Sequence, residues 1–150
     1  MTADTHNGAQ MIEQRHYNPF QDALSRALAR APALSVISLT DAQGDQIGVV
    51  WGAKTQVNPE ALGLIQVYGQ LAHQRAPYTI HEVSVQRDGL QWTSLSLHVE
   101  SDRYDLWAAW STEATQHEVS SAQAPVIPTQ AEVSIMLSIL ARELTPLLIG

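Results

Sequence analysis

Apolar residues recur at helical spacing in three stretches of the chain, and strand-like patterns fill the segments between them. The first helical stretch follows Asn18–Pro19, where asparagine is a favourable N-cap and proline fits the first helical position. Its apolar residues fall within an arc of roughly 140° at about 100° per residue. We therefore predict a helix with one buried face, ended by Pro32. The apolar residues are Phe20, Ala23, Leu24, Ala27, Leu28 and Ala31.

The segment 34–51 predicts a β-hairpin. Residues 34–39, "LSVISL", are rich in β-branched side chains and carry few polar residues on either face. That composition is typical of a strand buried from both sides. The polar segment Asp41–Asp45 contains Gly44 and is predicted to form the turn, and Ile47–Trp51 the return strand.

The second helical stretch starts with the same signal at Asn58–Pro59 and is predicted to run to about Arg75, before Pro77. Its apolar residues cover roughly 220° of the helix, against about 140° for the first helix. We expect a second copy of this helix to cover the excess, with the long loop described below as the alternative. The apolar residues are Ala61, Leu62, Leu64, Ile65, Val67, Tyr68, Leu71 and Ala72; Gln66, Gln70, His73 and Gln74 make up the polar remainder.

Two glycines lie inside this second helix, where each costs about 1 kcal/mol relative to alanine. A close approach of another backbone would explain Gly69. For Gly63 we favour simple tolerance on an exposed face.

Three strands are predicted next, over residues 79–87, 90–100 and 103–111. The first two alternate apolar and polar residues, and Arg87–Asp88–Gly89 is a favourable hairpin turn between them. The third is apolar on both faces, so it belongs in the middle of a sheet. Trp92 shares a face with serines and a histidine, and we hypothesise that it caps a contact surface.

The remaining chain predicts a loop and a closing helix. Residues 112–130 are rich in Thr, Ser, Gln and Ala, and we expect a long loop there. Thr129 and Glu132 form a capping box. The last helix follows through Val133, Met136, Leu137, Leu140 and Leu144 to Pro146.

These elements predict an α/β sandwich of order α-β-β-α-β-β-β-α, in a single domain over residues 18–150 with an N-terminal tail at 1–17. The first and fifth strands would lie in the middle of a five-stranded central sheet, the third at an edge, and helices on both faces. One domain of this kind is the usual size for 150 residues, of which 45 % are hydrophobic.

Charge and cysteine content narrow the function. The net charge is −7, and the single lysine, Lys54, and seven arginines are scattered. Proteins that bind nucleic acids or anionic membranes need clustered basic residues, so we expect neither as a partner of this protein. There is no cysteine, no secretory signal at the N-terminus and no run apolar enough to insert into a membrane, so a cytoplasmic location is expected.

Motifs that carry chemistry are absent. The chain has no G-x-S-x-G elbow, no H-E-x-x-H and no phosphate-binding glycine loop. His98 and Glu100 alternate along one strand, and His81 on a neighbouring strand could join them, but we interpret them as surface residues. We therefore expect no catalytic residues, no metal and no cofactor.

The hairpin "VISLTDAQGDQIGVVWG", after a helix ending in "ARAPAL" and before the closing helix, resembles the roadblock family, relatives of a dynein light chain. The resemblance spans about residues 18–148. Asp41, Gly44 and the following Ile47–Val50 match the strand–turn–strand pattern of the family. The long loop at 112–130 departs from it.

The resemblance implies a homodimer that joins its sheets through the third strand and packs its second helices together. Bacterial roadblock domains often accompany small Ras-like GTPases, so it also implies a non-catalytic regulatory or scaffold protein for such a GTPase or another protein partner. The implied dimer interface comprises Leu64, Val67, Tyr68, Leu71, Ile80, Val83 and Val85.

An acidic dimeric secretion chaperone that binds a protein client is the alternative. Such chaperones place three strands before the middle helix and two after it, whereas this sequence predicts two and three. The number of strands between the first two helices therefore separates these two hypotheses.

Overall fold

The computed structural model describes residues 18–52, 58–75, 82–112 and 127–149. Within these ranges the elements follow the predicted order. The tail at 1–17, residues 79–81 of the third predicted strand and most of the predicted loop 112–130 lie outside the described residues. The helices are α2 (Pro19–Arg30), α3 (Pro59–Arg75) and α5 (Gln130–Ile149), and the strands are β1 (Val36–Asp41), β2 (Gln46–Trp51), β3 (Glu82–Arg87), β4 (Leu90–Val99) and β5 (Asp102–Ser111).

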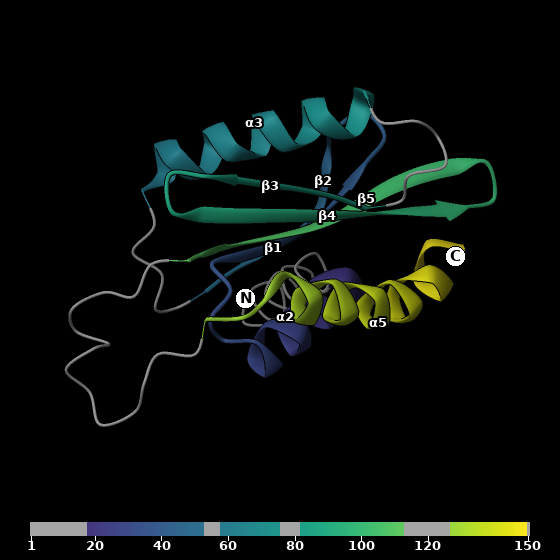
Figure 1. The fold of residues 1–150 in the computed structure, drawn as a ribbon. Coiled ribbons are helices and arrows are strands. Elements are labelled where there is room, and N and C mark those ends of the chain that lie inside the picture. Colours follow the sequence, from purple (N-terminus) through teal and green to yellow (C-terminus); the bar gives the residue numbers. More distant parts are fainter. Residues whose placement is uncertain (1–17, 53–57, 76–81, 113–126, 150) are drawn as a thin grey trace, which may run out of the picture.

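The five strands form one antiparallel sheet in the order β2-β1-β5-β4-β3. The predicted placement is confirmed, because β1 and β5 lie inside the sheet and β3 lies at an edge. Two described strands, β1 and β2, separate the first two helices. Figure 1 shows α3 on one face of the sheet and α2 with α5 on the other. The sheet is therefore buried from both sides, as the apolar pattern of β1 requires.

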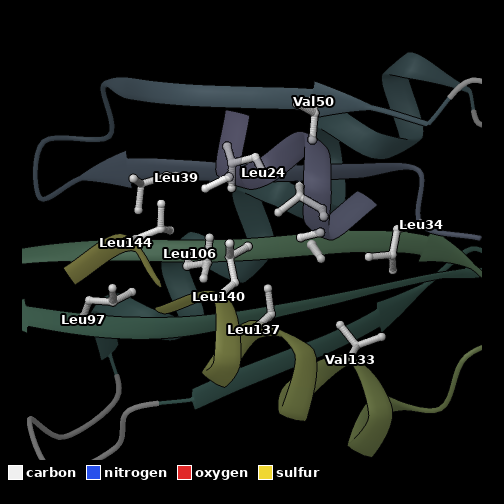
Figure 2. Close-up of a cluster of buried hydrophobic side chains, with 14 of the residues drawn as sticks. Leu24, Leu34, Leu39, Val50, Leu97, Leu106, Val133, Leu137, Leu140 and Leu144 are labelled. Carbon is white, nitrogen blue, oxygen red and sulfur yellow. The ribbon is translucent and has the colours of Figure 1, made fainter. Parts of the chain in front are cut away.

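The larger hydrophobic core lies between the sheet and the pair α2 and α5 (Figure 2). The predicted buried face of α2 is confirmed, since Ala23, Leu24 and Ala27 are buried in this core. The periodic residues of α5 meet them, together with alternate residues of β1, β4 and β5. Those from α5 are Val133, Leu137, Leu140 and Leu144.

The second core lies between the sheet and α3. Leu62 and Ile65 of α3 pack there on the two tryptophans Trp92 of β4 and Trp107 of β5. The two rings are tilted by 32° with centroids 6.1 Å apart, a favourable aromatic arrangement. Trp92 is 1 % exposed, so the hypothesis that it caps a contact surface is wrong. Its side chain is covered because α3 packs over this face of β4.

The predicted helix caps are present. The Asn18 side chain accepts hydrogen bonds from the amides of Phe20 and Gln21, at 2.9 and 3.3 Å. The Asn58 side chain accepts one from Glu60, at 2.9 Å. At the start of α5, Thr129 Oγ1 accepts a hydrogen bond from the amide of Glu132, as its capping box predicts.

The predicted end of the last helix at Pro146 is wrong, because α5 continues to Ile149. Proline removes a single backbone hydrogen bond, the one to the carbonyl four residues earlier. Leu144 and Leu148, on either side of Pro146, both pack against the larger core. Their burial outweighs the loss of one bond within two turns of the helix end.

Both predicted turns form. Asp41 Oδ1 accepts hydrogen bonds from the amides of Gln43 and Asp45, each at 2.9 Å, and Gly44 adopts φ +88°. Asp88 and Gly89, with φ 52° and 76°, join β3 to β4 in the left-handed conformation that a two-residue hairpin requires. None of the helices in the described ranges is long and apolar enough to cross a lipid bilayer.

Candidate functional site

The outward face of α3 carries a row of exposed apolar side chains, which we call the α3 stripe: Leu64, Val67, Tyr68 and Leu71. They are spaced three and four residues apart, so they lie along one face of the helix. Their exposed fractions are 42 %, 53 %, 41 % and 43 %. The stripe is therefore the part of the 220° apolar arc that the protein's own sheet leaves uncovered.

A cation lies over the tyrosine of the α3 stripe. The guanidinium carbon of Arg87, from β3, is 4.4 Å from the ring centroid of Tyr68. This distance is within the range of a cation–π interaction. The contact links the α3 stripe to β3, the edge strand of the sheet.

The two edges of the sheet differ in how much of their backbone is free. At β2, the amide of Val49 donates to Gln21 Oε1 at 3.1 Å, and its carbonyl accepts from Gln21 Nε2 at 2.5 Å. The carbonyl of Ile47 accepts from Asn18 Nδ2 at 3.2 Å. Side chains of α2 and its cap thus bind three outward-facing backbone groups of β2. At the opposite edge, β3 pairs with β4 and with no other described strand.

The residues assigned to the dimer interface from the sequence divide into three groups. Leu64, Val67, Tyr68 and Leu71 share the exposed surface. Val83 and Val85 are half-buried and pack beneath α3 against the second core, so their side chains face the protein rather than the solvent. Ile80 lies outside the described residues.

A polar cluster that the sequence did not reveal lies under the C-terminal half of α3. His73, grouped with the polar remainder of the helix, is turned towards the sheet and is 4 % exposed. Its Nε2 is hydrogen-bonded to Ser96 Oγ of β4, and Ser96 Oγ donates to Asp105 Oδ1 of β5 at 3.3 Å. Arg103 donates to both oxygens of Asp105, at 3.3 and 3.5 Å.

Serine, histidine and aspartate are together here, but their order differs from that of a hydrolytic triad. A triad needs the carboxylate on one ring nitrogen of the histidine and the serine on the other. Here Ser96 and Asp105 both lie on the Nε2 side, the latter at 3.9 Å, and Nδ1 is buried without a partner among the described residues. The serine hydroxyl is bonded to the carboxylate itself, so the histidine cannot relay its proton in the way that nucleophilic catalysis requires.

Burial lowers the pKa of His73 below its usual value, with Asp105 acting in the opposite direction and Arg103 in the same direction as burial. The imidazole is therefore neutral at pH 7. Its contact with Asp105 is that of a neutral ring beside a carboxylate whose charge Arg103 already compensates.

The candidate metal ligands in the described ranges are exposed, and two arginines of α2 form ion pairs. His98 and Glu100 are exposed, His81 lies outside the described residues, and no three metal-ligating side chains of the described ranges gather into a site. Arg26 and Arg30 lie 4.0 and 3.8 Å from Glu143 of α5 in exposed ion pairs.

Gly69 explains how closely α3 approaches the sheet. A Cβ atom placed on Gly69 would lie 2.5 Å from Cζ3 and 2.6 Å from Cδ2 of Trp92. The expected approach at this glycine is therefore to an aromatic ring, and the expectation of another backbone is wrong within this chain. A Cβ on Gly63 would meet nothing within 4 Å, which agrees with tolerance on an exposed face.

Comparison with known proteins identifies the fold. No protein-family model and no curated protein matches the sequence. Three solved structures are each 14 % identical to the chain: MglB from Myxococcus xanthus (TM-score 0.53, covering 89 % of this chain and 90 % of that one), gliding protein MglB from Thermus thermophilus (0.54, 87 % and 88 %) and a Roadblock/LC7 domain from Streptomyces avermitilis (0.50, 87 % and 98 %). Together with the element order and the sheet topology, these similarities show that the chain has a roadblock-like fold.

Proposed function

We propose that this protein acts by binding rather than by catalysis, as a homodimeric regulatory or scaffold protein. The observation that carries the proposal is the α3 stripe, a row of four half-exposed apolar side chains on α3, the one helix among the described residues on its face of the sheet. Apolar surface of this kind, next to a sheet edge, is typical of protein interfaces.

The difference between the sheet edges supports pairing through β3. Exposed strand edges pair with other chains unless they are covered. Gln21 and Asn18 cover the edge at β2, so β3 is the edge to which we assign the second copy. In the proposed dimer the two β3 strands join the sheets and the two α3 stripes pack together, while Val83 and Val85 support α3 from beneath.

The free energy of association indicates that the proposed dimer needs both the contact between the α3 stripes and the pairing of the β3 strands. Burying an apolar side chain completely is worth about 1.5–3 kcal/mol, so each half-exposed member of the stripe contributes roughly 1 kcal/mol. Two stripes together contribute about 8 kcal/mol. Association costs about 4–15 kcal/mol in lost freedom. The stripe alone is therefore marginal, and backbone pairing along β3 supplies the rest.

The partner we propose is a small Ras-like GTPase, on the basis of the roadblock resemblance. The sequence has no phosphate-binding glycine loop, so nucleotide binding and hydrolysis belong to the partner. A regulatory effect then requires that the protein binds the GTP and GDP states of the GTPase with unequal affinity.

Sedimentation equilibrium tests the dimer. We expect the wild type to have the mass of a dimer at tens of micromolar, and Leu71→Glu to have that of a folded monomer, because a carboxylate would be buried in the apolar contact. Ile135→Glu is the matched control: Ile135 is 63 % exposed on α5, in the opposite layer, and its change should leave the mass unaltered. A monomeric wild type would refute the proposal.

Affinity measurements test the GTPase partner separately. The GTPase that co-purifies from the native cell would be loaded with GDP or with a GTP analogue, and its binding measured against the dimer. We expect the two affinities to differ and the dimer alone to neither bind nor hydrolyse nucleotide. Equal affinities would refute regulation of the GTPase and leave only a passive scaffold.

A further inference from the structure

The open edge of β3 presents the backbone groups of alternate residues only. The amide of Thr112, just after β5, donates at 2.8 Å to the carbonyl of Gly89, just before β4, so the backbone of Gly89 points towards β5. This orientation alternates along a strand, so every second residue of β4 after Gly89 also bonds to β5. The β3 residues opposite those positions turn their N–H and C=O groups away from β4, towards the open edge. They are Glu82, Ser84 and Gln86.

A second copy can bond to these groups in only a few registers. In an antiparallel pair, the outward-pointing groups of one strand must face those of the other. In a two-fold symmetric pair, one residue then lies on the axis opposite itself, and residues equally far from it on either side face each other. With the axis at Ser84, every outward-pointing residue of β3 has a partner: Ser84 faces the partner's Ser84, and Glu82 faces the partner's Gln86.

The two neighbouring registers are less favourable. An axis at Val85 places Glu82 opposite the partner's Asp88, and like charges directly opposite each other are destabilising. Asp88 also belongs to the hairpin turn, with φ 52°, so its backbone does not continue the strand. An axis at Val83 leaves Gln86 without a partner within β3. Only the axis at Ser84 sets the Glu82 carboxylate against a neutral amide that can donate to it.

The position of α3 agrees with an axis in the middle of β3. Gly69 contacts the side chain of the β4 residue that pairs with Val85. His73 is bonded to β4 one position past the residue that pairs with Glu82. Leu71, halfway between Gly69 and His73, therefore lies at the level of the middle of β3. An axis at this level brings the Leu71 side chains of two copies, each 43 % exposed, towards each other.

We propose that the second copy pairs with β3 in a single register, with the two-fold axis at Ser84. This inference rests on the homodimer proposed above and adds to it the residues that face each other across the axis. Glu82 lies opposite the partner's Gln86 on one face of the joined sheet. On the other face, Val83 lies opposite the partner's Val85, so the apolar layer beneath α3 continues from one copy into the next. The surface that recognises the second copy thus combines polar side chains of β3 with the α3 stripe.

Disulfide cross-linking tests the register, because the chain contains no cysteine of its own. The Cα atoms of a hydrogen-bonded antiparallel pair are about 5.5 Å apart, within the range that a disulfide spans. Under mild oxidation, Ser84→Cys alone should therefore form a covalent dimer.

Glu82→Cys and Gln86→Cys are the matched controls on the same edge. Each cysteine would lie about 13 Å along the strand from its own symmetry mate, too far for a disulfide. Neither variant should cross-link alone, whereas the two refolded together should give a covalent heterodimer. Glu82 and Gln86 are exposed, so this pair tests the register even if Ser84→Cys does not fold.

Sedimentation of each variant before oxidation shows separately whether the dimer is present. Suppose that the mass is dimeric and that the mixture of Ser84→Cys with Gln86→Cys, or with Glu82→Cys, forms the heterodimer instead. The axis would then lie at Val85 or Val83, which overturns the register and leaves the homodimer standing. A dimeric mass without any of these cross-links would overturn pairing through β3. A monomeric mass would refute the homodimer itself, and the register with it.

Discussion

Replacing Gly69 with alanine should destabilise the protein, although alanine is the better helix former. The added Cβ would lie 2.5 Å from Cζ3 of Trp92, where an ordinary carbon–carbon contact is about 3.5–4.0 Å. Trp92 cannot easily retreat, because it is 1 % exposed and packs on Trp107. Either α3 must move away from the sheet by about 1 Å or the ring must leave its place.

The magnitude follows from two opposing effects. Helix propensity favours alanine over glycine by about 1 kcal/mol. Overfilling a packed core costs about 1–3 kcal/mol, and a contact this short belongs at the upper end. We therefore expect Gly69→Ala to lower the free energy of unfolding by about 1–2 kcal/mol.

Gly63→Ala in the same helix is the matched control. Its Cβ would meet nothing within 4 Å, so only the propensity remains and the variant should gain about 0.5–1 kcal/mol. Urea unfolding followed by far-ultraviolet circular dichroism measures both, in a Leu71→Glu background so that association does not contribute. Equal stabilisation by the two alanines would refute the close packing of α3 on Trp92.

Three further predictions concern His73, the helix caps and the covered sheet edge. As pH falls below about 6.5, the unfolded chain binds a proton that buried His73 does not. The free energy of unfolding of the wild type should therefore decline by at most about 1.4 kcal/mol per pH unit more than that of His73→Gln. Urea unfolding at pH 7.5 and 5.5 measures this difference, and identical pH dependence of the two proteins would contradict it. Asn18→Ala removes a cap and the bond to β2, so it should cost about 1–2 kcal/mol, more than Asn58→Ala at about 1 kcal/mol, both measured by thermal unfolding. Gln21→Ala frees the backbone of β2, and light scattering should then detect assemblies larger than those of the wild type; unchanged scattering would show that this edge needs no cover.

Much of the fold was predictable because its signals are local. The asparagine–proline pairs at 18 and 58 and the Asp–Gly turn each act within a few residues, and each appears where the sequence predicts it. The position of β1 and β5 inside the sheet followed from their apolar faces. Such patterns report on burial without knowledge of the partner that covers them.

The wrong predictions concern residues whose burial depends on which element of the fold packs over them. Trp92 stands among serines on its strand, and only the approach of α3 at Gly69 makes it a core residue. His73 looked like a surface residue, yet Leu62, Ile65, Gly69 and His73 follow one another at intervals of three and four, which is a signal for a common inward face. At Pro146 the burial of Leu148, a tertiary effect, overrides a local helix-breaking signal.

The separation of the two faces of α3 has a consequence for how such a protein can diverge. The residues that fasten α3 to the sheet are distinct from those of the α3 stripe, so a substitution in the stripe leaves the interior untouched. If the α3 stripe is the proposed dimer contact, natural selection can therefore alter the choice of partner in single steps while the fold stays stable. In a symmetric dimer each such step enters the contact twice. After gene duplication, a change in one copy alone would favour either homodimers or heterodimers of the two copies. Repeated duplication could in this way produce several proteins of the same fold, each of which pairs with a different partner.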